Sequence, residues 1–140
     1  MAPNAYKQWV VLTITNSFSS RPLMIKNASL SWGKFHRNGN KDEELSPSEI
    51  DKIVIPPGSV QSVSSCGRSD AASGTEGTID LYDNETKVCT LYWNCPWGSP
   101  TNNFEVRDVN KAGGYIVSNG PWNVSGGALG NIAIEAAIKG

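Results

Sequence analysis

Val10-Val11-Leu12-Thr13-Ile14-Thr15 is the stretch that decides the fold, because large apolar side chains occupy every second position along it. Successive side chains of an extended chain point to opposite sides, so Val10, Leu12 and Ile14 share one strongly apolar face. The same alternation returns near the other end of the chain, in residues 132–138. Both segments are therefore predicted to be β-strands, and their regularity predicts that both ends of the chain are tied into sheets.

Between these two segments lie further short stretches of strand-forming residues, each bounded by turn signals. They are residues 23–32, 53–55, 59–66, 78–82, 87–93, 103–107 and 115–117. About eight to ten strands at a spacing of about 8–12 residues are typical of a β-sandwich or barrel. The chain has no internal repeat, linker or charge block that would divide it. We therefore expect an all-β protein, a single-domain, mainly antiparallel β-sandwich over residues 1–140.

Turn chemistry separates the expected strands. Gly33 is expected to bend the chain, and Asn38-Gly39-Asn40 predicts a hairpin because Asn and Gly tolerate a positive φ. Ser46-Pro47-Ser48-Glu49 predicts one helical turn, with the first serine as N-cap and the glutamate closing a capping box. Pro56-Pro57-Gly58 predicts a turn, and residues 67–77 predict a loop of small and polar side chains.

Composition limits the partners of the protein. The 140 residues carry 12 basic and 13 acidic side chains, for a net charge of −1. Without a basic bias, a nucleic-acid partner or a purely electrostatic attachment to anionic lipids is disfavoured. Apolar runs are far shorter than the ~20 residues that span a bilayer. Residues 1–9 lack the features of a secretory signal, which predicts a soluble chain that is cytoplasmic or unconventionally secreted.

The residues that usually carry catalysis or bind metals are sparse. His36 is the only histidine, and no motif around any serine or cysteine supplies it with a nucleophile. Cys66, Cys89 and Cys95 lack the spacing of metal ligands and are expected to be reduced, buried thiols. A Cys66–Cys95 disulfide is the weaker alternative. We therefore predict no enzyme activity, no catalytic residue, no metal and no cofactor.

The aromatic residues are the strongest functional signal. Tyr92, Trp93 and Trp97 fall within six residues, and Pro96 and Gly98 break the strand that leads into them. Aromatic rings at a strand end and on the next loop suit a surface that is apolar at one edge and wet at the other. Trp97 is expected to be exposed because it lies between Pro96 and Gly98, which both interrupt strands. Trp93 fits the core and the surface equally well.

Two further tryptophans occupy similar places, Trp32 before a glycine and Trp122 after a proline. Such a set suits a membrane interface, a site for a choline-like cation, or a sugar that stacks on flat rings. Composition alone does not decide whether the ligand of these aromatic residues is a lipid or a sugar. Arg68 could contact a phosphate, since its planar fork suits that group, or could pair with Asp70 and pin the loop.

Several motifs are shared with one family. They are Ala5-Tyr6-Lys7-Gln8-Trp9-Val10, Lys26 to Lys34, Asn38 to Asp42, Cys66-Gly67-Arg68-Ser69-Asp70-Ala71, Tyr92 to Ser99 with Thr101-Asn102, and Gly126 to Gly130. Because these segments run in order through the whole chain, the sequence resembles the aegerolysins. The resemblance implies an actinoporin-like β-sandwich. Pro100 departs from the family pattern, which has a lysine there, and the Ser73-Gly74 tip lacks the acidic residue of some members.

What the resemblance implies about function is binding of membrane sphingolipids. Members recognise sphingomyelin in sterol-rich membranes or ceramide phosphoethanolamine, and several form pores with a partner that carries a membrane attack complex/perforin domain. The expectation is a peripheral lipid-recognising component of a two-part cytolysin or hemolysin. The expected lipid-binding residues are Trp32, Tyr92, Trp93, Trp97 and Trp122, with Arg68 and Asp70 for polar contacts. A carbohydrate-binding, lectin-like β-sandwich is the alternative.

Overall fold

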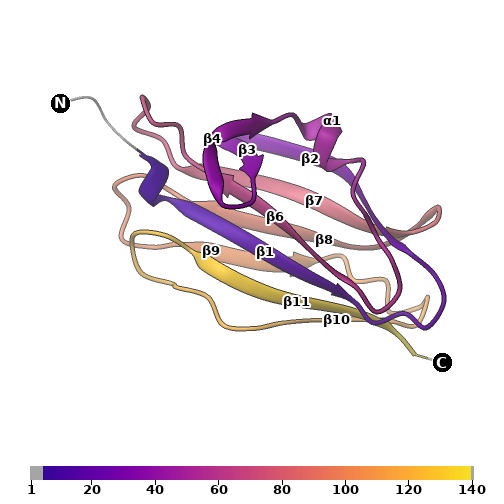
Figure 1. The fold of residues 1–140 in the computed structure, drawn as a ribbon. Helices are drawn as coiled ribbons and strands as arrows, with labels where there is room; N and C mark the ends of the chain where they lie inside the picture. The colour runs from indigo at the N-terminus through magenta and orange to yellow at the C-terminus, as the bar shows by residue number, and fades with distance from the viewer. Residues whose placement is uncertain (1–4, 140) are drawn as a thin grey trace.

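Two β-sheets pack face to face in the computed structural model, which describes residues 5–139 (Figure 1). The predicted domain of residues 1–140 also includes Met1 to Asn4 and Gly140, which lie outside the described residues. The six-stranded sheet has the order β10 (Tyr115–Asn119), β11 (Gly130–Ile138), β1 (Trp9–Asn16), β6 (Val60–Cys66), β3 (Lys34–Arg37) and β4 (Asn40–Leu45). The five-stranded sheet has the order β5 (Val54–Ile55), β2 (Leu23–Trp32), β7 (Thr75–Asp83), β8 (Thr86–Cys95) and β9 (Asn103–Arg107).

Both end segments of the described chain lie inside the six-stranded sheet, as their alternation predicted. β1 pairs with β11 in parallel, with Leu12 opposite Ile132 and Ile14 opposite Ile134. On its other side β1 pairs antiparallel with β6. The β1–β11 pair is parallel, while the other strand pairs in the two sheets are antiparallel, so the all-β, mainly antiparallel sandwich is confirmed.

The chain crosses from one sheet to the other at Gly33. This residue joins β2 to β3 and has φ +89°, a conformation that a glycine adopts without strain. A Cβ atom there would lie 2.6 Å from the carbonyl oxygen of Cys66. The expected bend is thus confirmed, and it ends β2 at Trp32, on the rim of the sandwich.

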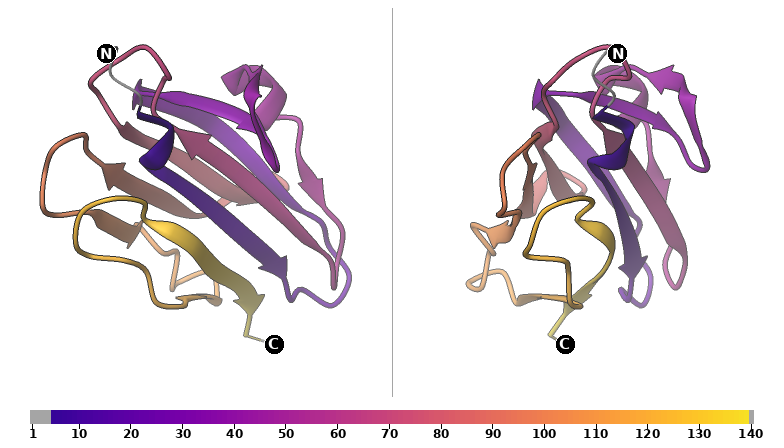
Figure 2. Two further views of the ribbon diagram at one scale, coloured as in Figure 1. Left: turned by 60° about the vertical axis from the view of Figure 1, so that its left-hand side comes forward. Right: turned by 90° about the vertical axis from the view of Figure 1, so that its left-hand side faces the viewer.

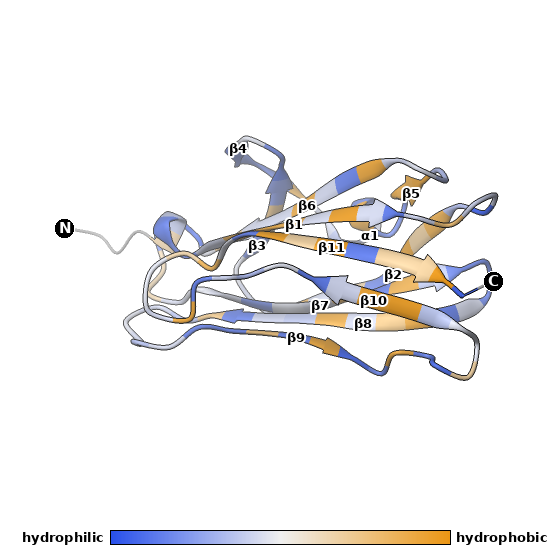
Figure 3. Ribbon diagram, turned by 90° about the horizontal axis from the view of Figure 1, so that it is seen from below, coloured by the Kyte–Doolittle hydropathy of each residue, from blue (hydrophilic) through white to orange (hydrophobic). Residues whose placement is uncertain are grey.

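One apolar cluster fills the space between the sheets. The alternating buried residues of β1 and β11 point into it, and Figure 3 shows hydrophobic positions along both strands. Trp93 belongs to this cluster with 0% of its surface exposed, and its ring meets Phe35 edge-on at 6.0 Å between centroids. Burial of such rings is the main stabilising contribution to a core of this kind.

Several local predictions are confirmed. Helix α1 (Pro47–Ile50) begins at the N-cap Ser46 and has the complete capping box with Glu49. Cys66, Cys89 and Cys95 are free and buried, and burial raises the pKa of the Cys89 thiol to about 12. The other helical segment is the 3-10 turn η1 (Ala5–Lys7).

Two details of the strand assignment differ from the sequence-based expectation. Residues 42–44 were not expected to form a strand, but they lie in β4. The loop expected over residues 67–77 ends earlier, because β7 begins at Thr75. Both helical segments described between residues 5 and 139 fall far short of the length and hydrophobicity of a membrane-crossing helix.

Candidate functional site

One end of the sandwich gathers three long loops. They are residues 67–74 after β6, residues 96–102 after β8 and residues 120–129 before β11. Figures 1 and 2 place all three at the same end, next to η1 and the start of β1. The opposite end carries the tighter turn between β7 and β8 and the last residues of β11. The aromatic residues at the ends of β2 and β8 therefore meet the loops at a single rim.

A cavity of about 270 Å³ opens at this rim and is lined by the indoles of Trp32 and Trp97. Trp32 is paired with Glu76 in the strand register, and Glu76 is paired with Asn94. The register therefore sets an indole, a carboxylate and an amide in one row across β2, β7 and β8. We call this site the Trp32–Trp97 cavity; Ala72, Ser73, Gly74, Thr75 and Pro96 complete its lining.

Both indoles are open to solvent. Trp32 is 59% exposed and Trp97 is 40% exposed, which is unusual for so large an apolar side chain. The expectation that Trp97 is exposed is confirmed. Its loop turns at Gly98, where φ is +71°. Two exposed indoles on one rim are the arrangement that membrane interfaces favour.

A buried amide holds the loops of this rim together. The side chain of Asn102 donates hydrogen bonds to the carbonyl oxygens of Asn123 at 3.1 Å and Gly127 at 3.2 Å. Thr101 and Ser125 form an antiparallel bridge beside it. The loop that carries Trp97 is thus fastened to residues 120–129.

The loop of residues 67–74 is fixed by close backbone packing. A Cβ atom at Gly74 would lie 1.7 Å from the carbonyl oxygen of Cys95, so only glycine fits at this position. At the other end of the loop, a Cβ atom at Gly67 would lie 2.3 Å from the Cβ of Ala5. Residues 67–74 are therefore pressed against the end of β8 and against η1, and they form one wall of the cavity.

Tyr92 lies beside the cavity on the outer face of the five-stranded sheet. Its hydroxyl donates a hydrogen bond to the carboxylate of Glu76, and the guanidinium of Arg107 lies 3.9 Å from the centre of its ring. Burial, followed by the hydrogen bond to Glu76, raises the pKa of Tyr92 to about 12. Tyr92 therefore orients the carboxylate of Glu76, while that carboxylate also lines the cavity.

The structure divides the other predicted aromatic residues between core and loop. Trp93 is fully buried, and its Nε1 donates to the hydroxyl of Thr75 at 3.0 Å. The indole belongs to the core, so Trp93 cannot contribute to a surface as the binding set assumed. Trp122 is half-buried, packs on the core and supports residues 120–129. Of the five aromatic residues expected to bind lipid, Trp32 and Trp97 line the cavity and Tyr92 adjoins it.

Arg68 and Asp70 are both exposed on the loop of residues 67–74. The guanidinium of Arg68 forms a two-pronged ion pair with Glu44 of β4, at 2.8 and 2.9 Å. Of the two alternatives left open for Arg68, a phosphate contact or a pair with Asp70, the structure shows a loop-fixing ion pair as in the second, but with Glu44 as the partner. The hydrogen bond between Arg68 and Glu44 raises the pKa of Arg68 and lowers the pKa of Glu44.

Sequence reasoning missed Glu76 as a site residue. The residue was placed in a loop, whereas it lies on the second position of β7 and faces outward. The outward alternation of Glu76, Thr78, Asp80 and Tyr82 along that strand is the signal that could have identified it.

The Trp32–Trp97 cavity has the chemistry to hold a cation. Ring faces attract quaternary ammonium groups, and the carboxylate of Glu76 adds an opposite charge. A metal ion has no comparable site, because residues 5–139 contain no group of three or more His, Cys, Asp or Glu side chains placed to hold one.

Comparison with known proteins gives consistent matches over nearly the whole chain. A family model described as aegerolysin matches residues 7–139. Asp-hemolysin from Aspergillus fumigatus is 50% identical over 135 residues, covering 96% of this chain and 96% of that protein. Ostreolysin A6 from Pleurotus ostreatus is 41% identical over 139 residues, covering 97% and 99%. The solved structure of RahU protein in complex with a TRIS molecule has a TM-score of 0.91 at 36% identity, covering 97% and 98%.

Proposed function

The chain belongs to the aegerolysin family, and from that premise we propose that it binds the headgroup of a membrane sphingolipid through the Trp32–Trp97 cavity. The observation that carries the proposal is the meeting of Trp32, Trp97 and Glu76, which come from separate segments and surround one open cavity. The names of two relatives, a hemolysin and an ostreolysin, support an action on membranes.

In this proposal the cavity contacts the positive end of the headgroup. Sphingomyelin and ceramide phosphoethanolamine both present an ammonium group beyond a phosphate, and a neutral polar lipid such as ceramide does not. The ammonium group enters between the indoles of Trp32 and Trp97 and faces the carboxylate of Glu76. The hydrogen bond from Tyr92 holds that carboxylate in place before the lipid arrives.

Attachment to the membrane is peripheral in this proposal. The exposed indole of Trp97 enters the interface of the bilayer, while the sandwich stays outside it. With a net charge of −1, attraction to anionic lipids contributes little. Because phosphatidylcholine carries the same phosphocholine group as sphingomyelin, selectivity for sphingolipids also requires contacts with the amide and hydroxyl of the sphingoid backbone. Arg68 keeps its ion pair with Glu44 and acts as an anchor of the loop.

We propose further that the protein supplies lipid recognition to a pore made with a larger partner of the membrane attack complex/perforin type. Its compact two-sheet fold supports a platform role, and spanning segments would come from the partner. The protein makes or breaks no bond in this scheme. On its own it is expected to bind vesicles without releasing an entrapped dye, and dye release is expected once such a partner is added.

Co-sedimentation with vesicles tests the proposal. The vesicles contain phosphatidylcholine alone, with sphingomyelin, with sphingomyelin and sterol, or with ceramide phosphoethanolamine. We expect selective binding to a sphingolipid mixture, and about a tenfold or larger loss of affinity in Trp97→Ala. Tyr82→Ala is the matched control, because this half-buried aromatic lies on β7 at the far end of the same sheet. Failure to bind any sphingolipid mixture, or equal binding by Trp97→Ala, would contradict the proposal.

A further inference from the structure

A second concave surface lies on the outer face of the six-stranded sheet. Its floor is a row of side chains across four strands, in which His36 of β3 is paired with Ser64 of β6, Ser64 with Val11 of β1, and Val11 with Asn131 of β11. Trp9 follows in the next row of β1. This row belongs to a different sheet from the one that carries the Trp32–Trp97 cavity.

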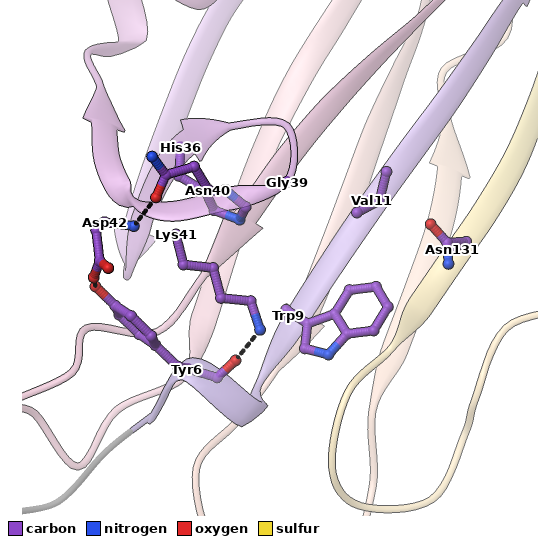
Figure 4. A pocket seen from close by; sticks show the side chains of 9 residues that line it. All are labelled: Tyr6, Trp9, Val11, His36, Gly39, Asn40, Lys41, Asp42 and Asn131. Carbon is purple, nitrogen blue, oxygen red and sulfur yellow. Dashed lines mark hydrogen bonds between the residues drawn. The ribbon is translucent and has the colours of Figure 1, made fainter.

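The hairpin of β3 and β4 forms the wall of this surface. Residues 39–42 rise over the floor, and together with Tyr6 of η1 they enclose a groove of about 530 Å³ (Figure 4). We call it the hairpin groove. The wall is fastened in two places, since the hydroxyl of Tyr6 donates to Asp42 at 2.9 Å and the ammonium of Lys41 donates to the carbonyl oxygen of Tyr6 at 2.7 Å. A volume of this size is in the range of small-molecule sites.

His36, at the floor of the hairpin groove, contributes a second observation. The imidazole is 4% exposed, and its Nδ1 lies 2.8 Å from the carbonyl oxygen of Arg37. Because a carbonyl oxygen can only accept, Nδ1 carries the proton, and Nε2 of the neutral ring is an acceptor. Among the described residues Nε2 has no hydrogen-bond partner. Buried polar groups are nearly always paired, so this atom calls for a donor.

The surroundings of His36 keep its ring neutral. Burial is the main cause that lowers the pKa of His36, and the ammonium groups of Lys41 and Lys34 act in the same direction. The carbonyl groups of Arg37 and Asn40 act in the opposite direction without reversing the shift. A ligand that reaches Nε2 of His36 therefore has to offer this atom a hydrogen-bond donor, as a hydroxyl group does.

The remaining side chains of the hairpin groove complete the chemistry of a hydroxyl-rich ligand. Figure 4 shows the indole of Trp9 beside the ammonium of Lys41, and Asn131 opposite the hairpin. The ammonium of Lys41 lies 5.4 Å from the centre of the Trp9 ring, so a ligand stacks on the ring face that Lys41 leaves open. The amides of Asn131 and Asn40 can both donate and accept. Lys41 and Asp42 carry opposite charges side by side, so the groove favours neither an anion nor a cation strongly.

We propose that the hairpin groove binds a neutral sugar ring, which stacks on Trp9 and exchanges hydrogen bonds with Asn131 and the hairpin. One sugar hydroxyl donates to Nε2 of His36 after the side chains above this atom move aside. The sugar belongs to a free glycan or to the headgroup of a neutral glycolipid, two sources that offer the same ring. This inference does not depend on the Trp32–Trp97 cavity, because the two sites share no lining residue.

Saturation-transfer NMR and calorimetry with a panel of methyl hexosides and neutral oligosaccharides test this site. We expect saturable binding by the unaltered protein and a loss of about tenfold or more in affinity, which is about 1.4 kcal/mol, in Asn131→Leu and Trp9→Ala. Asn131 is exposed, so its replacement leaves the core untouched. Asn119→Leu is the matched control, an exposed asparagine on the edge strand β10 that does not line the groove. Trp97→Ala is expected to bind the sugars normally.

A parallel arm replaces the free sugars by vesicles of phosphatidylcholine with a neutral glycosphingolipid. Binding of both probes, weakened by Asn131→Leu, indicates that the ring alone is recognised, and binding of the vesicles alone assigns the site to glycolipids. The proposal is overturned if neither the sugars nor the glycolipid vesicles bind. It is also overturned if binding survives both Asn131→Leu and Trp9→Ala, or is lost in Trp97→Ala while those variants retain it.

Discussion

Tryptophan serves two opposite purposes in this molecule. Trp93 is fully buried in the core, where its one polar atom donates to Thr75. Trp97, four residues later in the chain, stands on a loop with 40% of its surface exposed. The turn between them, set by Pro96 and Gly98, separates a residue that stabilises the fold from one that is free to contact a membrane.

Replacing Trp93 tests the first purpose. Trp93→Phe removes the hydrogen bond to Thr75 and leaves a gap in a packed interior. We expect the free energy of unfolding to fall by about 1–3 kcal/mol, measured by urea denaturation. The matched change at an exposed position, Trp32→Phe, is expected to leave the urea midpoint almost unchanged. Equal losses in the two variants would contradict the assignment of Trp93 to the core.

How far the sequence predicts these residues depends on what determines their burial. The breakers around Trp97 are local, so its exposure could be predicted from its neighbours in the chain. Trp93 lies at the end of an alternating segment, and alternation does not say which face of a strand is covered. Glu76 becomes a site residue only through pairing between strands, and the partner of Arg68 is set by the distant strand β4.

At the scale of elements, loops are ordered by a few buried polar contacts. The amide of Asn102 is 2% exposed and connects the loop of Trp97 to residues 120–129. Asn102→Ala is expected to leave these carbonyl groups unpaired and to lower the free energy of unfolding by about 1–3 kcal/mol. Hydrogen exchange is expected to accelerate in residues 96–102 and 120–129 before it does in the sheets. Unchanged exchange in both loops would show that Asn102 does not hold them.

A second buried contact joins the other end of the sandwich. Asp83 at the end of β7 accepts hydrogen bonds from Arg21 at 2.8 Å and from the hydroxyl of Tyr115 at 2.7 Å. The hydrogen bond from Arg21, more than that from Tyr115, holds the pKa of Asp83 below its ordinary value. The carboxylate thus links the loop before β2 and strand β10 to the five-stranded sheet.

The lowered pKa of Asp83 fixes the sign of a pH dependence. Its stabilising effect is complete above the pKa of the unfolded chain, about 3.9, and is lost as the pH falls toward the folded value. Asp83→Asn is therefore expected to lower the thermal midpoint at neutral pH. The difference from the unaltered protein is expected to shrink as the pH falls below about 4. A difference that stays constant from neutral to acidic pH would contradict this role.

Elements were predictable where their signals were local. The capping box of Ser46 and Glu49, the bend at Gly33 and strand β9 all follow from adjacent residues. Strand β4 was not predicted, because its polar sequence resembles a loop and only pairing with β3 makes it a strand. The hairpin groove depends on that same pairing, which explains why the sequence did not reveal it.

On the scale of the whole molecule, the two sheets place their functional surfaces differently. The loop end of the five-stranded sheet carries the Trp32–Trp97 cavity, and the outer face of the six-stranded sheet carries the hairpin groove. A membrane that meets the loop end contacts Trp97 directly, while the buried Trp93 stays out of reach. Trp97 is therefore expected to contact the lipid and Trp93 is not.

Fluorescence quenching by brominated phosphatidylcholine, in vesicles that also contain the sphingolipid bound in sedimentation, tests this central claim most directly. Indole fluorescence is quenched on contact with brominated chains, so the unaltered protein is expected to lose emission on binding. In Trp97→Phe, at a vesicle concentration that restores full binding, most of that quenching is expected to disappear. Undiminished quenching in fully bound Trp97→Phe, or a bound unaltered protein whose emission does not change, would contradict the claim that the Trp97 rim enters the membrane.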